Sequence, residues 1–220
     1  MRHYIFPIGF HEDYIMRRLL NKMPSQDDHI TIITCRPAGP GNKTAYKNLE
    51  AWLSNIGLPH ILDPLQEISC NHVEEAIAEI RQLIESSKGD HVIIDVSGGM
   101  RILALTTTLA TILSEKNIEI CIQSEQGQDL GCIPVEIIRI IRKGLTPEEK
   151  HLLETIIENP GQTAKQYAQI LGRTEKTIQN RLAKLAKHHL IIRKGKGPKI
   201  YPSKWAKIFT TKTIPGDPGK

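Results

Sequence analysis

Residues 91–113 decide the fold of this chain, and they read HVIIDVSGGMRILALTTTLATIL. An apolar run from His91 to Val96 is followed at once by Ser97-Gly98-Gly99 and then by a second apolar stretch over 102–113. The first run has the length of a buried strand, and the second is long enough for a helix. A buried strand that passes through glycines directly into a helix is typical of a parallel sheet covered by helices.

The same alternation of strand and helix extends on both sides of this stretch. Strands are predicted at 4–8, 30–35, 61–62 and 118–122, and helices at 12–22, 44–56 and 73–84. This pattern predicts an α/β fold, with a Rossmann-like, mostly parallel sheet in the order 3-2-1-4-5 and helices on both faces. Residues 133–135 are expected at an edge, because Pro134 has no N–H for a central strand ladder. Residues 137–142 fit either a continued strand or a connecting helix.

A different pattern begins at Gly144. Thr146 is expected as a helix N-cap, with Pro147 at the first helical position and Glu149 completing a capping box. Two more helices follow, capped by Thr163 and Thr174, and then a basic hairpin. Three helices followed by a basic hairpin are typical of a winged helix-turn-helix. We therefore predict an α/β domain at 1–143, a winged helix-turn-helix domain at 144–209 and a disordered tail at 210–220.

Charge is divided unequally along the chain. Residues 143–220 contain 16 Lys and Arg against 6 Asp and Glu, a net charge of +10, whereas residues 1–142 carry −5. This division indicates that only the C-terminal part binds a polyanion. No stretch approaches the roughly 18 consecutive apolar residues of a membrane helix, and the N-terminus lacks a signal-peptide cleavage site. A cytoplasmic protein without a membrane partner is therefore expected.

Cysteine and histidine spacing predicts no metal site. The four cysteines include no C-x-x-C pair, so they are expected to be buried, reduced thiols. Residues 39–44, Gly-Pro-Gly-Asn-Lys-Thr, fail the P-loop pattern because Asn42 separates the glycine from Lys43. We expect a solvated loop there and no ATPase activity.

The third C-terminal helix has the composition of a helix that reads DNA. With Ile178, Leu182 and Leu185 facing the core, its polar side chains face outward. Amide side chains bind adenine edges and Arg or Lys binds guanine edges, while cations on the hairpin contact phosphates. The predicted contacts to double-stranded DNA are Arg173, Thr174, Lys176, Thr177, Gln179, Asn180, Arg181, Lys184, Arg193, Lys194, Lys196 and Lys199. The alternative is a winged domain used only for protein contacts.

Two strand ends in the N-terminal part are candidates for a ligand site. In the expected strand order, strands one and four flank the switch point, outside which ligands bind. Glycines let the backbone approach a phosphate, the next helix offers free N–H groups, and Arg101 offers a guanidinium fork. The candidate ligand-binding residues are Gly9, Phe10, His11, Ser97, Gly98, Gly99, Met100 and Arg101. The alternative is a tight turn that needs glycine only for its backbone angles.

Gly9-Phe10, residues 95–101 and the C-terminal winged domain together resemble the archaeal CRISPR-associated transcription regulators, over about residues 1–205. These proteins fuse a CRISPR-associated Rossmann-fold (CARF) sensor domain to a winged helix-turn-helix. The family typically has threonine at position 97, and Ser97 keeps the hydroxyl. The resemblance implies a homodimeric regulator of CRISPR-Cas genes that binds promoter DNA. It further implies cyclic oligoadenylate, of the cyclic tetra-adenylate kind, as an allosteric ligand, with no cofactor, metal or catalytic residue.

Two enzymatic alternatives remain open from the sequence. Arg181 and His188 are separated by six residues, which matches the R-x4–6-H signature of the ribonuclease domains carried by other CARF proteins. A helical nuclease has no place for the predicted basic hairpin, so this reading ranks second. The other alternative is a sensor domain that itself cleaves cyclic oligoadenylate slowly, since His11, Ser97 and Arg101 share the candidate pocket.

Overall fold

The computed structural model describes residues 1–124, 126–195 and 199–210. It divides into two compact units, Met1–Ile138 and Arg139–Lys220. Among the described residues, no helix is both long and apolar enough to cross a membrane.

The first unit is built on one six-stranded sheet in the order β3-β2-β1-β4-β5-β6. The first five strands pair in parallel, and β6 alone is antiparallel, against β5. This confirms the predicted order 3-2-1-4-5 and the Rossmann-like class. The strand bounds are β1 Arg2–Pro7, β2 His29–Cys35, β3 Gln66–Ile68, β4 His91–Asp95, β5 Ile118–Gln123 and β6 Asp129–Ile133.

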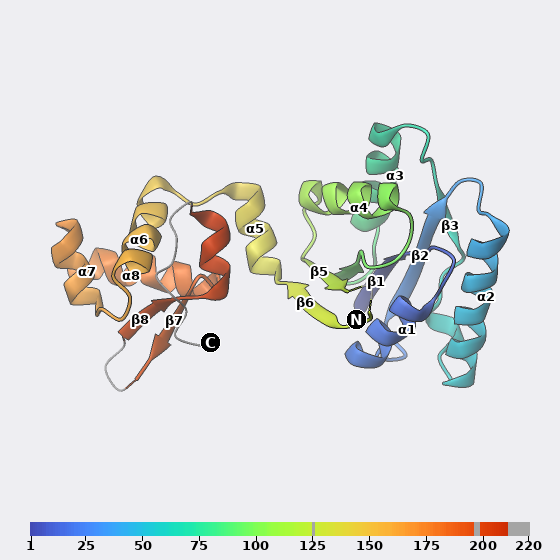
Figure 1. The fold of residues 1–220 in the computed structure, drawn as a ribbon, viewed down its shortest axis with the longest axis horizontal. Coiled ribbons are helices and arrows are strands. Elements are labelled where there is room, and N and C mark those ends of the chain that lie inside the picture. The colour runs from blue at the N-terminus through green and yellow to red at the C-terminus, as the bar shows by residue number, and fades with distance from the viewer. Residues whose placement is uncertain (125, 196–198, 211–220) are drawn as a thin grey trace. The chain divides into compact units, whose positions relative to one another are not determined.

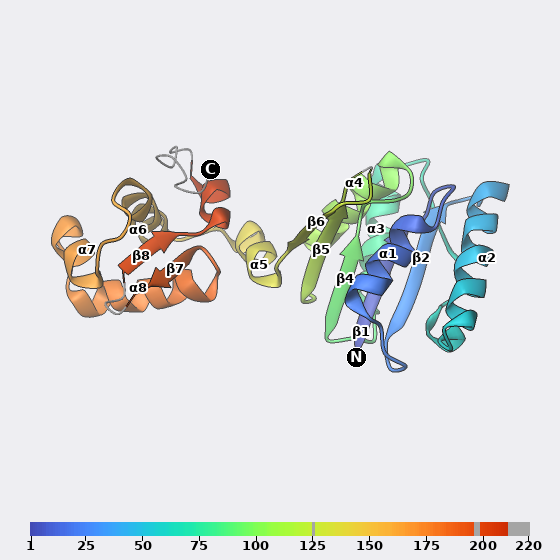
Figure 2. The same ribbon diagram turned by 60° about the horizontal axis from the view of Figure 1, so that its bottom comes forward.

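Helices cover both faces of this sheet (Figures 1 and 2). Tyr4 and Phe6 of β1 pack against α1 and α2, whereas Ile5 points to the opposite face, toward α3 and α4. This alternation follows from the strand period of two residues. The helix bounds are α1 Asp13–Lys22, α2 Pro40–Asn55, α3 Val73–Glu85, α4 Arg101–Leu113 and α5 Val135–Lys143.

Several boundaries differ from the sequence prediction. The third strand is Gln66–Ile68, not 61–62, because Ile61 lies in the short 3-10 helix η1 (Pro59–Ile61) and Leu62 makes only an isolated bridge to Ile30. The prediction of a solvated loop at 39–44 is contradicted from Pro40 onward, because α2 begins at that residue. The edge strand expected at 133–135 lies earlier, as β6, and Val135 already begins α5. The open choice at 137–142 is settled as this helix.

The expectation of reduced cysteines is contradicted, because the structure pairs all four as disulfides. Cys121 and Cys132 lie directly opposite each other in the β5–β6 ladder and are bonded. Cys35 at the end of β2 is bonded to Cys70, which follows the neighbouring strand β3. Strand register brings these residues together, and sequence spacing alone does not reveal that register.

The second unit has the winged helix-turn-helix arrangement that the sequence predicts. Thr146 accepts a hydrogen bond from Glu149 N, and the Glu149 carboxylate accepts one from Thr146 N, so the predicted capping box is present. Thr163 and Thr174 cap the next two helices as predicted. The bounds are α6 Pro147–Glu158, α7 Ala164–Leu171, α8 Glu175–Lys187, β7 Ile191–Lys194, β8 Lys199–Pro202 and the 3-10 helix η2 Lys204–Phe209. Of the predicted tail at 210–220, residues 211–220 lie outside the described residues.

Candidate ligand and DNA-binding sites

The loops that follow β1 and β4 meet at the carboxyl edge of the sheet. A Cβ placed on Gly9 would lie 3.4 Å from both Cα and N of Gly99, so the two backbones are in contact. Phe10 and Met100 are 74% and 50% exposed, and His11 and Arg101 are also exposed. The structure thus brings the two predicted ligand-binding loops together, with aromatic and cationic side chains exposed, whereas Gly9, Ser97 and Gly98 are half-buried.

Gly99 has a structural reason to be glycine. Its φ is +83°, a region that side chains with a Cβ rarely adopt, and a Cβ there would lie 2.8 Å from Cβ of Pro7. At Gly98 an added Cβ would stand 3.2 Å from the Pro7 carbonyl oxygen. Both glycines therefore let the 97–100 loop pack on the end of β1, which is the alternative that the sequence left open. This requirement does not conflict with ligand binding, because the outer side of the loop stays exposed.

Arg101 lies at the first helical position of α4 and makes no hydrogen bond or ion pair with the described residues. The N-cap, Met100, contributes no side-chain hydrogen bond, so the first N–H groups of α4 have no side-chain partner at the cap. A helix N-terminus carries a partial positive charge, and a cation placed there is unfavourable unless an anion joins it. The N–H groups and the guanidinium together favour an anionic ligand.

The amino end of α2 forms a third side of this patch. The Asn42 amide donates to the carbonyl of Gly9 at 3.1 Å and accepts from Gly39 N at 3.2 Å. The Phe10 ring lies against Gly41, where a Cβ would come within 2.5 Å of the ring. Asn42 is only 8% exposed. It therefore fixes the loop after β1 through its hydrogen bond to Gly9 and is not part of a solvated loop.

Ser97 does not present a free hydroxyl to the surface. Its hydroxyl donates to the Asp95 carboxylate in a short hydrogen bond and accepts from Gln123 N at 2.6 Å. Asp95 also accepts from Ser97 N at 2.9 Å. A hydrogen bond from this hydroxyl to a ligand therefore requires these bonds to break, whereas the backbone of the loop is available as it stands.

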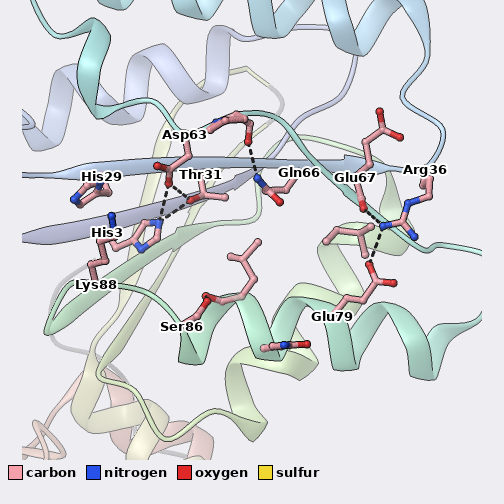
Figure 3. A pocket seen from close by; sticks show the side chains of 14 residues that line it. His3, His29, Thr31, Arg36, Asp63, Gln66, Glu67, Glu79, Ser86 and Lys88 are labelled. Atoms are coloured by element: carbon pink, nitrogen blue, oxygen red, sulfur yellow. Dashed lines mark hydrogen bonds and ion pairs between the residues drawn. The ribbon is translucent and has the colours of Figure 1, made fainter.

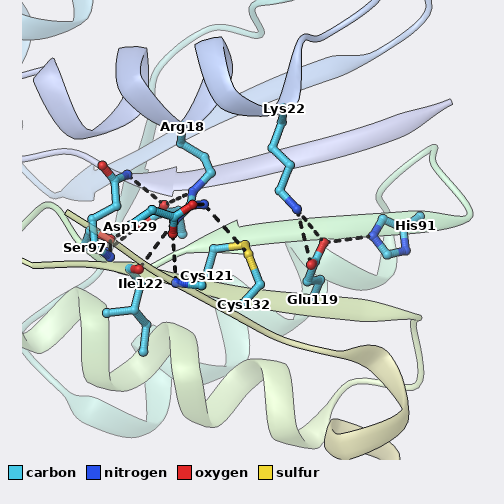
Figure 4. Close-up of a disulfide and its surroundings, with 12 residues drawn as sticks. Arg18, Lys22, His91, Ser97, Glu119, Cys121, Ile122, Asp129 and Cys132 are labelled. Atoms are coloured by element: carbon cyan, nitrogen blue, oxygen red, sulfur yellow. Dashed lines mark hydrogen bonds and ion pairs between the residues drawn. A yellow bond between two sulfur atoms is a disulfide. The ribbon is translucent and has the colours of Figure 1, made fainter. Parts of the chain in front are cut away.

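Beneath the loop lies a buried network that the sequence analysis missed (Figure 4). Arg18 of α1 is 1% exposed, and its Nε donates to Asp95 at 2.5 Å. Its two terminal nitrogens donate to Asp129 of β6 at 2.9 and 3.0 Å. Gln123 donates to Asp95 at 3.1 Å and to the Tyr14 carbonyl at 2.8 Å. A signal was present: Arg18 lies on the same helix face as Ile15 and Leu19, and Asp95 ends an apolar strand.

The network favours the charged forms of Arg18 and Asp129. Burial acts to lower the pKa of Arg18, but hydrogen bonds and charge attraction from Asp95 and Asp129 outweigh it, so the pKa is raised overall. The Arg18 hydrogen bond also lowers the pKa of Asp129. Arg18 thereby joins α1 to the end of β4, which carries the candidate ligand loop, and to the start of β6.

A separate groove of about 510 Å³ lies between β2 and α3 (Figure 3). The Thr31 hydroxyl donates to Asp63 at 2.6 Å and lies 2.7 Å from Nε2 of His3. Burial is the main reason that the pKa of His3 falls from 6.5 to about 4. The residues that line this groove include none from the 9–11 or 97–101 loops, so it is distinct from the candidate ligand site.

The lowered pKa of His3 predicts that acid destabilises the first unit. Because the folded-state pKa of His3 lies below its unfolded value, its stabilising effect is present above pH 6.5 and is lost as the pH falls toward 4. We expect the free energy of unfolding to drop by about 2 kcal/mol more in the wild type than in His3→Gln between pH 7 and pH 5. Urea unfolding at both pH values measures the free energy of unfolding of each protein. An equal decrease in the wild type and in His3→Gln would contradict the prediction.

Helix α8 presents the predicted outward face. Ile178, Leu182 and Leu185 are buried, whereas the predicted DNA contacts on the same helix are exposed or half-buried. Two of them already have partners: the Gln179 amide donates to Glu175 at 3.0 Å, and Lys184 lies 3.6 Å from the Glu149 carboxylate. Gln179 and Glu175 are exposed, and the Lys184 side chain is 67% exposed although Glu149 is buried, so both side chains can exchange these partners for DNA at little cost.

The hairpin places cations beside this helix. Arg193 and Gln179 line the same cavity of about 310 Å³, between α7, α8 and the hairpin. Lys194 lies over the Tyr201 ring, and Lys199 pairs with Lys194 across the hairpin. Arg173 and Thr174 are exposed at the start of α8. Lys196, at the predicted tip of the wing, lies outside the described residues.

Comparison with known families decides the identity of the first unit. The sequence model of the Csa3 CRISPR-associated Rossmann-like domain matches residues 2–134. The chain belongs to this family. The model of a second family, HVO_A0114, matches residues 144–207. Csa3 of Saccharolobus solfataricus, a CRISPR locus-related candidate DNA-binding protein, is 26% identical over 201 residues, which cover 91% of this chain and 84% of that protein.

Solved structures resemble the chain more distantly. Can2 from Sulfobacillus thermosulfidooxidans, in complex with cyclic tetra-adenylate, is 14% identical with a TM-score of 0.42, over 95% of this chain and 63% of that one. Enterococcus italicus Csm6, bound to cyclic hexa-2'-fluoro-hexa-dAMP, is 10% identical with a TM-score of 0.48, over 86% and 52% of the two chains. The present chain thus spans less than two thirds of either solved chain.

Proposed function

We propose that this Csa3-family protein is a ligand-responsive transcription regulator that binds promoter DNA of CRISPR-Cas genes through its winged helix-turn-helix. The observation that carries the DNA part is the outward face of α8, where exposed amide and cationic side chains stand beside a basic hairpin. Amide and guanidinium groups on one helix suit base edges in a major groove, and the hairpin cations suit backbone phosphates. The charge of +10 over residues 143–220 supports the same assignment.

The ligand part of the proposal is a cyclic oligoadenylate, such as cyclic tetra-adenylate, at the Gly9 and Ser97–Arg101 loops. The unpartnered Arg101 at the amino end of α4 carries it, because this position favours a phosphate. Phe10, which is 74% exposed beside the loop, offers a ring on which a base can stack. Binding at the sensor would change the affinity for DNA, and DNA would reciprocally change the affinity for the ligand.

A homodimer completes this proposal, because one chain supplies only half of a site for a twofold-symmetric ring. Helix α4 carries an apolar row on its surface: Leu105, Leu109 and Leu113 recur every four residues and are 56%, 37% and 52% exposed. Such a row is typical of a surface that another chain covers. We expect light scattering at micromolar concentration to give twice the mass of the chain, and Leu109→Glu to give a monomer. A monomeric wild type would contradict the dimer.

The DNA contacts predict two distinguishable variants. Gln179→Ala should reduce the preference for the operator over a scrambled duplex by about 1–3 kcal/mol, because an amide that reads a base is lost. Lys199→Ala should weaken binding to both duplexes alike and make the dependence on salt shallower, because only a phosphate contact is lost. Fluorescence anisotropy of the full chain across a salt series measures both effects. Salt-independent binding, or equal behaviour of the two variants, would contradict the assignment.

We propose regulation rather than catalysis. Arg181 lies within α8, His188 is its C-cap, and the hairpin follows directly, so the pair belongs to a winged domain and not to a helical nuclease. A ring nuclease built on Ser97 is disfavoured because that hydroxyl is engaged by Asp95 and Gln123. Degradation of an RNA reporter on addition of cyclic tetra-adenylate would reverse this ranking.

A further inference from the structure

The disulfide between β5 and β6 lies beside the carboxylate of Glu119, a group that also binds metal ions. Within the described residues, Glu119, Cys121 and Cys132 bring their ligand atoms within 4.8 Å of one another. Glu119 and Cys121 are two residues apart on one strand, so they share a face, and Cys132 lies opposite Cys121. His91 contacts Glu119 from the side away from the disulfide, with Nε2 3.5 Å from a Glu119 oxygen, and does not belong to this group (Figure 4).

We propose that this disulfide is reversible and that its reduced form binds one thiophilic divalent cation, such as Zn²⁺, through Cys121, Cys132 and Glu119. Two thiolates and a carboxylate, with solvent in the fourth position, are a donor set that suits Zn²⁺, whereas Mg²⁺ and Ca²⁺ prefer oxygen alone. Tetrahedral Zn²⁺ with Zn–S bonds of about 2.3 Å requires the sulfurs to stand about 3.8 Å apart. Rotation of the two cysteine side chains after the S–S bond breaks provides this separation, and the Glu119 carboxylate already lies within 4.8 Å of both sulfurs.

The charges around the site favour binding of a cation by the reduced form. Lys22 donates to both Glu119 oxygens, at 3.1 and 3.2 Å, and Arg18 lies 3.9 Å from the Cys132 sulfur. Two thiolates and a carboxylate carry −3, and Zn²⁺ reduces this to −1, which Lys22 balances. Without the cation, three negative charges in a largely buried site would cost several kcal/mol.

The reaction balances in two steps. A dithiol or phosphine reductant transfers two electrons to the disulfide and, with two protons, yields two thiols while the reductant is oxidised. The cation then displaces both thiol protons to solvent and forms two metal–sulfur bonds without any change in its own oxidation state. Reoxidation by a disulfide-type oxidant expels the cation and restores the S–S bond.

The chain contains a matched control for this site. Cys35 and Cys70 form a second disulfide at the end of β2. In the part of the chain that the structure describes, they join no group of three metal-binding side chains. A cation bound by thiols in general would use either pair, whereas the proposed site uses only Cys121 and Cys132.

Co²⁺ titration of the full chain tests the proposal, because thiolate–Co²⁺ charge-transfer absorption reports sulfur ligation. After reduction with a phosphine and its removal, we expect one Co²⁺ per chain, displaced by Zn²⁺, and no such band in the oxidised protein. Cys35→Ser/Cys70→Ser should keep the band, Cys121→Ser/Cys132→Ser should lose it, and Glu119→Gln should lower Co²⁺ affinity at least about tenfold. Failure of the reduced wild type to bind Co²⁺, or retention of the band by Cys121→Ser/Cys132→Ser, would overturn the proposal.

Discussion

Arg101→Ala is expected to lower the affinity for cyclic tetra-adenylate at least about a hundredfold. The guanidinium has no partner among the described residues, so its removal costs the fold little, while each chain loses a charge-assisted bond worth roughly 1.5–3 kcal/mol. In a symmetric dimer the ring contacts both chains, and two such losses amount to about a hundredfold or more in the dissociation constant. Isothermal titration calorimetry on the folded variant measures the change directly.

Arg81→Ala is the matched control, since Arg81 is an exposed arginine on α3 of the same unit, outside the candidate site. The affinity of Arg81→Ala for cyclic tetra-adenylate should equal that of the wild type. Gly99→Val is a poor substitute for Arg101→Ala, because a side chain at Gly99 collides with Pro7 and disturbs the loop itself. An unchanged affinity in Arg101→Ala would mean that the glycine turn serves the fold alone.

Arg18→Met is expected to destabilise the first unit by about 3 kcal/mol or more. The substitution keeps much of the side-chain volume but leaves Asp95, which is 2% exposed, without its cation. Urea unfolding monitored by circular dichroism measures the loss. Lys22→Met removes a partly exposed ion pair with Glu119 from the same helix and should cost less than about 1 kcal/mol.

A second substitution separates the lost charge partner from lost packing. Asp95→Asn in the Arg18→Met background removes the unpaired negative charge, so part of the lost stability should return. A loss in Arg18→Met no larger than that in Lys22→Met would show that the network contributes little to the fold.

The sequence predicted most of the architecture, because periodicity reports which face of an element is buried. The apolar strand 91–96, the capping box at Thr146–Glu149 and the stripe of Ile178, Leu182 and Leu185 each led to the correct element. The strand order followed from the alternation of strands and helices together with the rule for ligand-binding crevices.

What the sequence did not predict depends on contacts between distant segments. Residues 111 positions apart, Arg18 and Asp129, become neighbours only once β6 pairs with β5. The same pairing places Cys132 opposite Cys121, which overturned the expectation of reduced thiols. The Ser97 hydroxyl is likewise held inward by hydrogen bonds with Asp95 and Gln123. These two residues are brought together by the pairing of β4 with β5, which no sequence motif reveals.

The central claim is that the ligand at the sensor changes the affinity for DNA, and a mobility shift on CRISPR promoter DNA tests it most directly. We predict that saturating cyclic tetra-adenylate changes the dissociation constant of the wild-type protein for this DNA at least about fivefold, and leaves that of Arg101→Ala unchanged. Identical DNA affinity of the wild type with and without the ligand, under conditions where calorimetry shows the ligand bound, would contradict the claim.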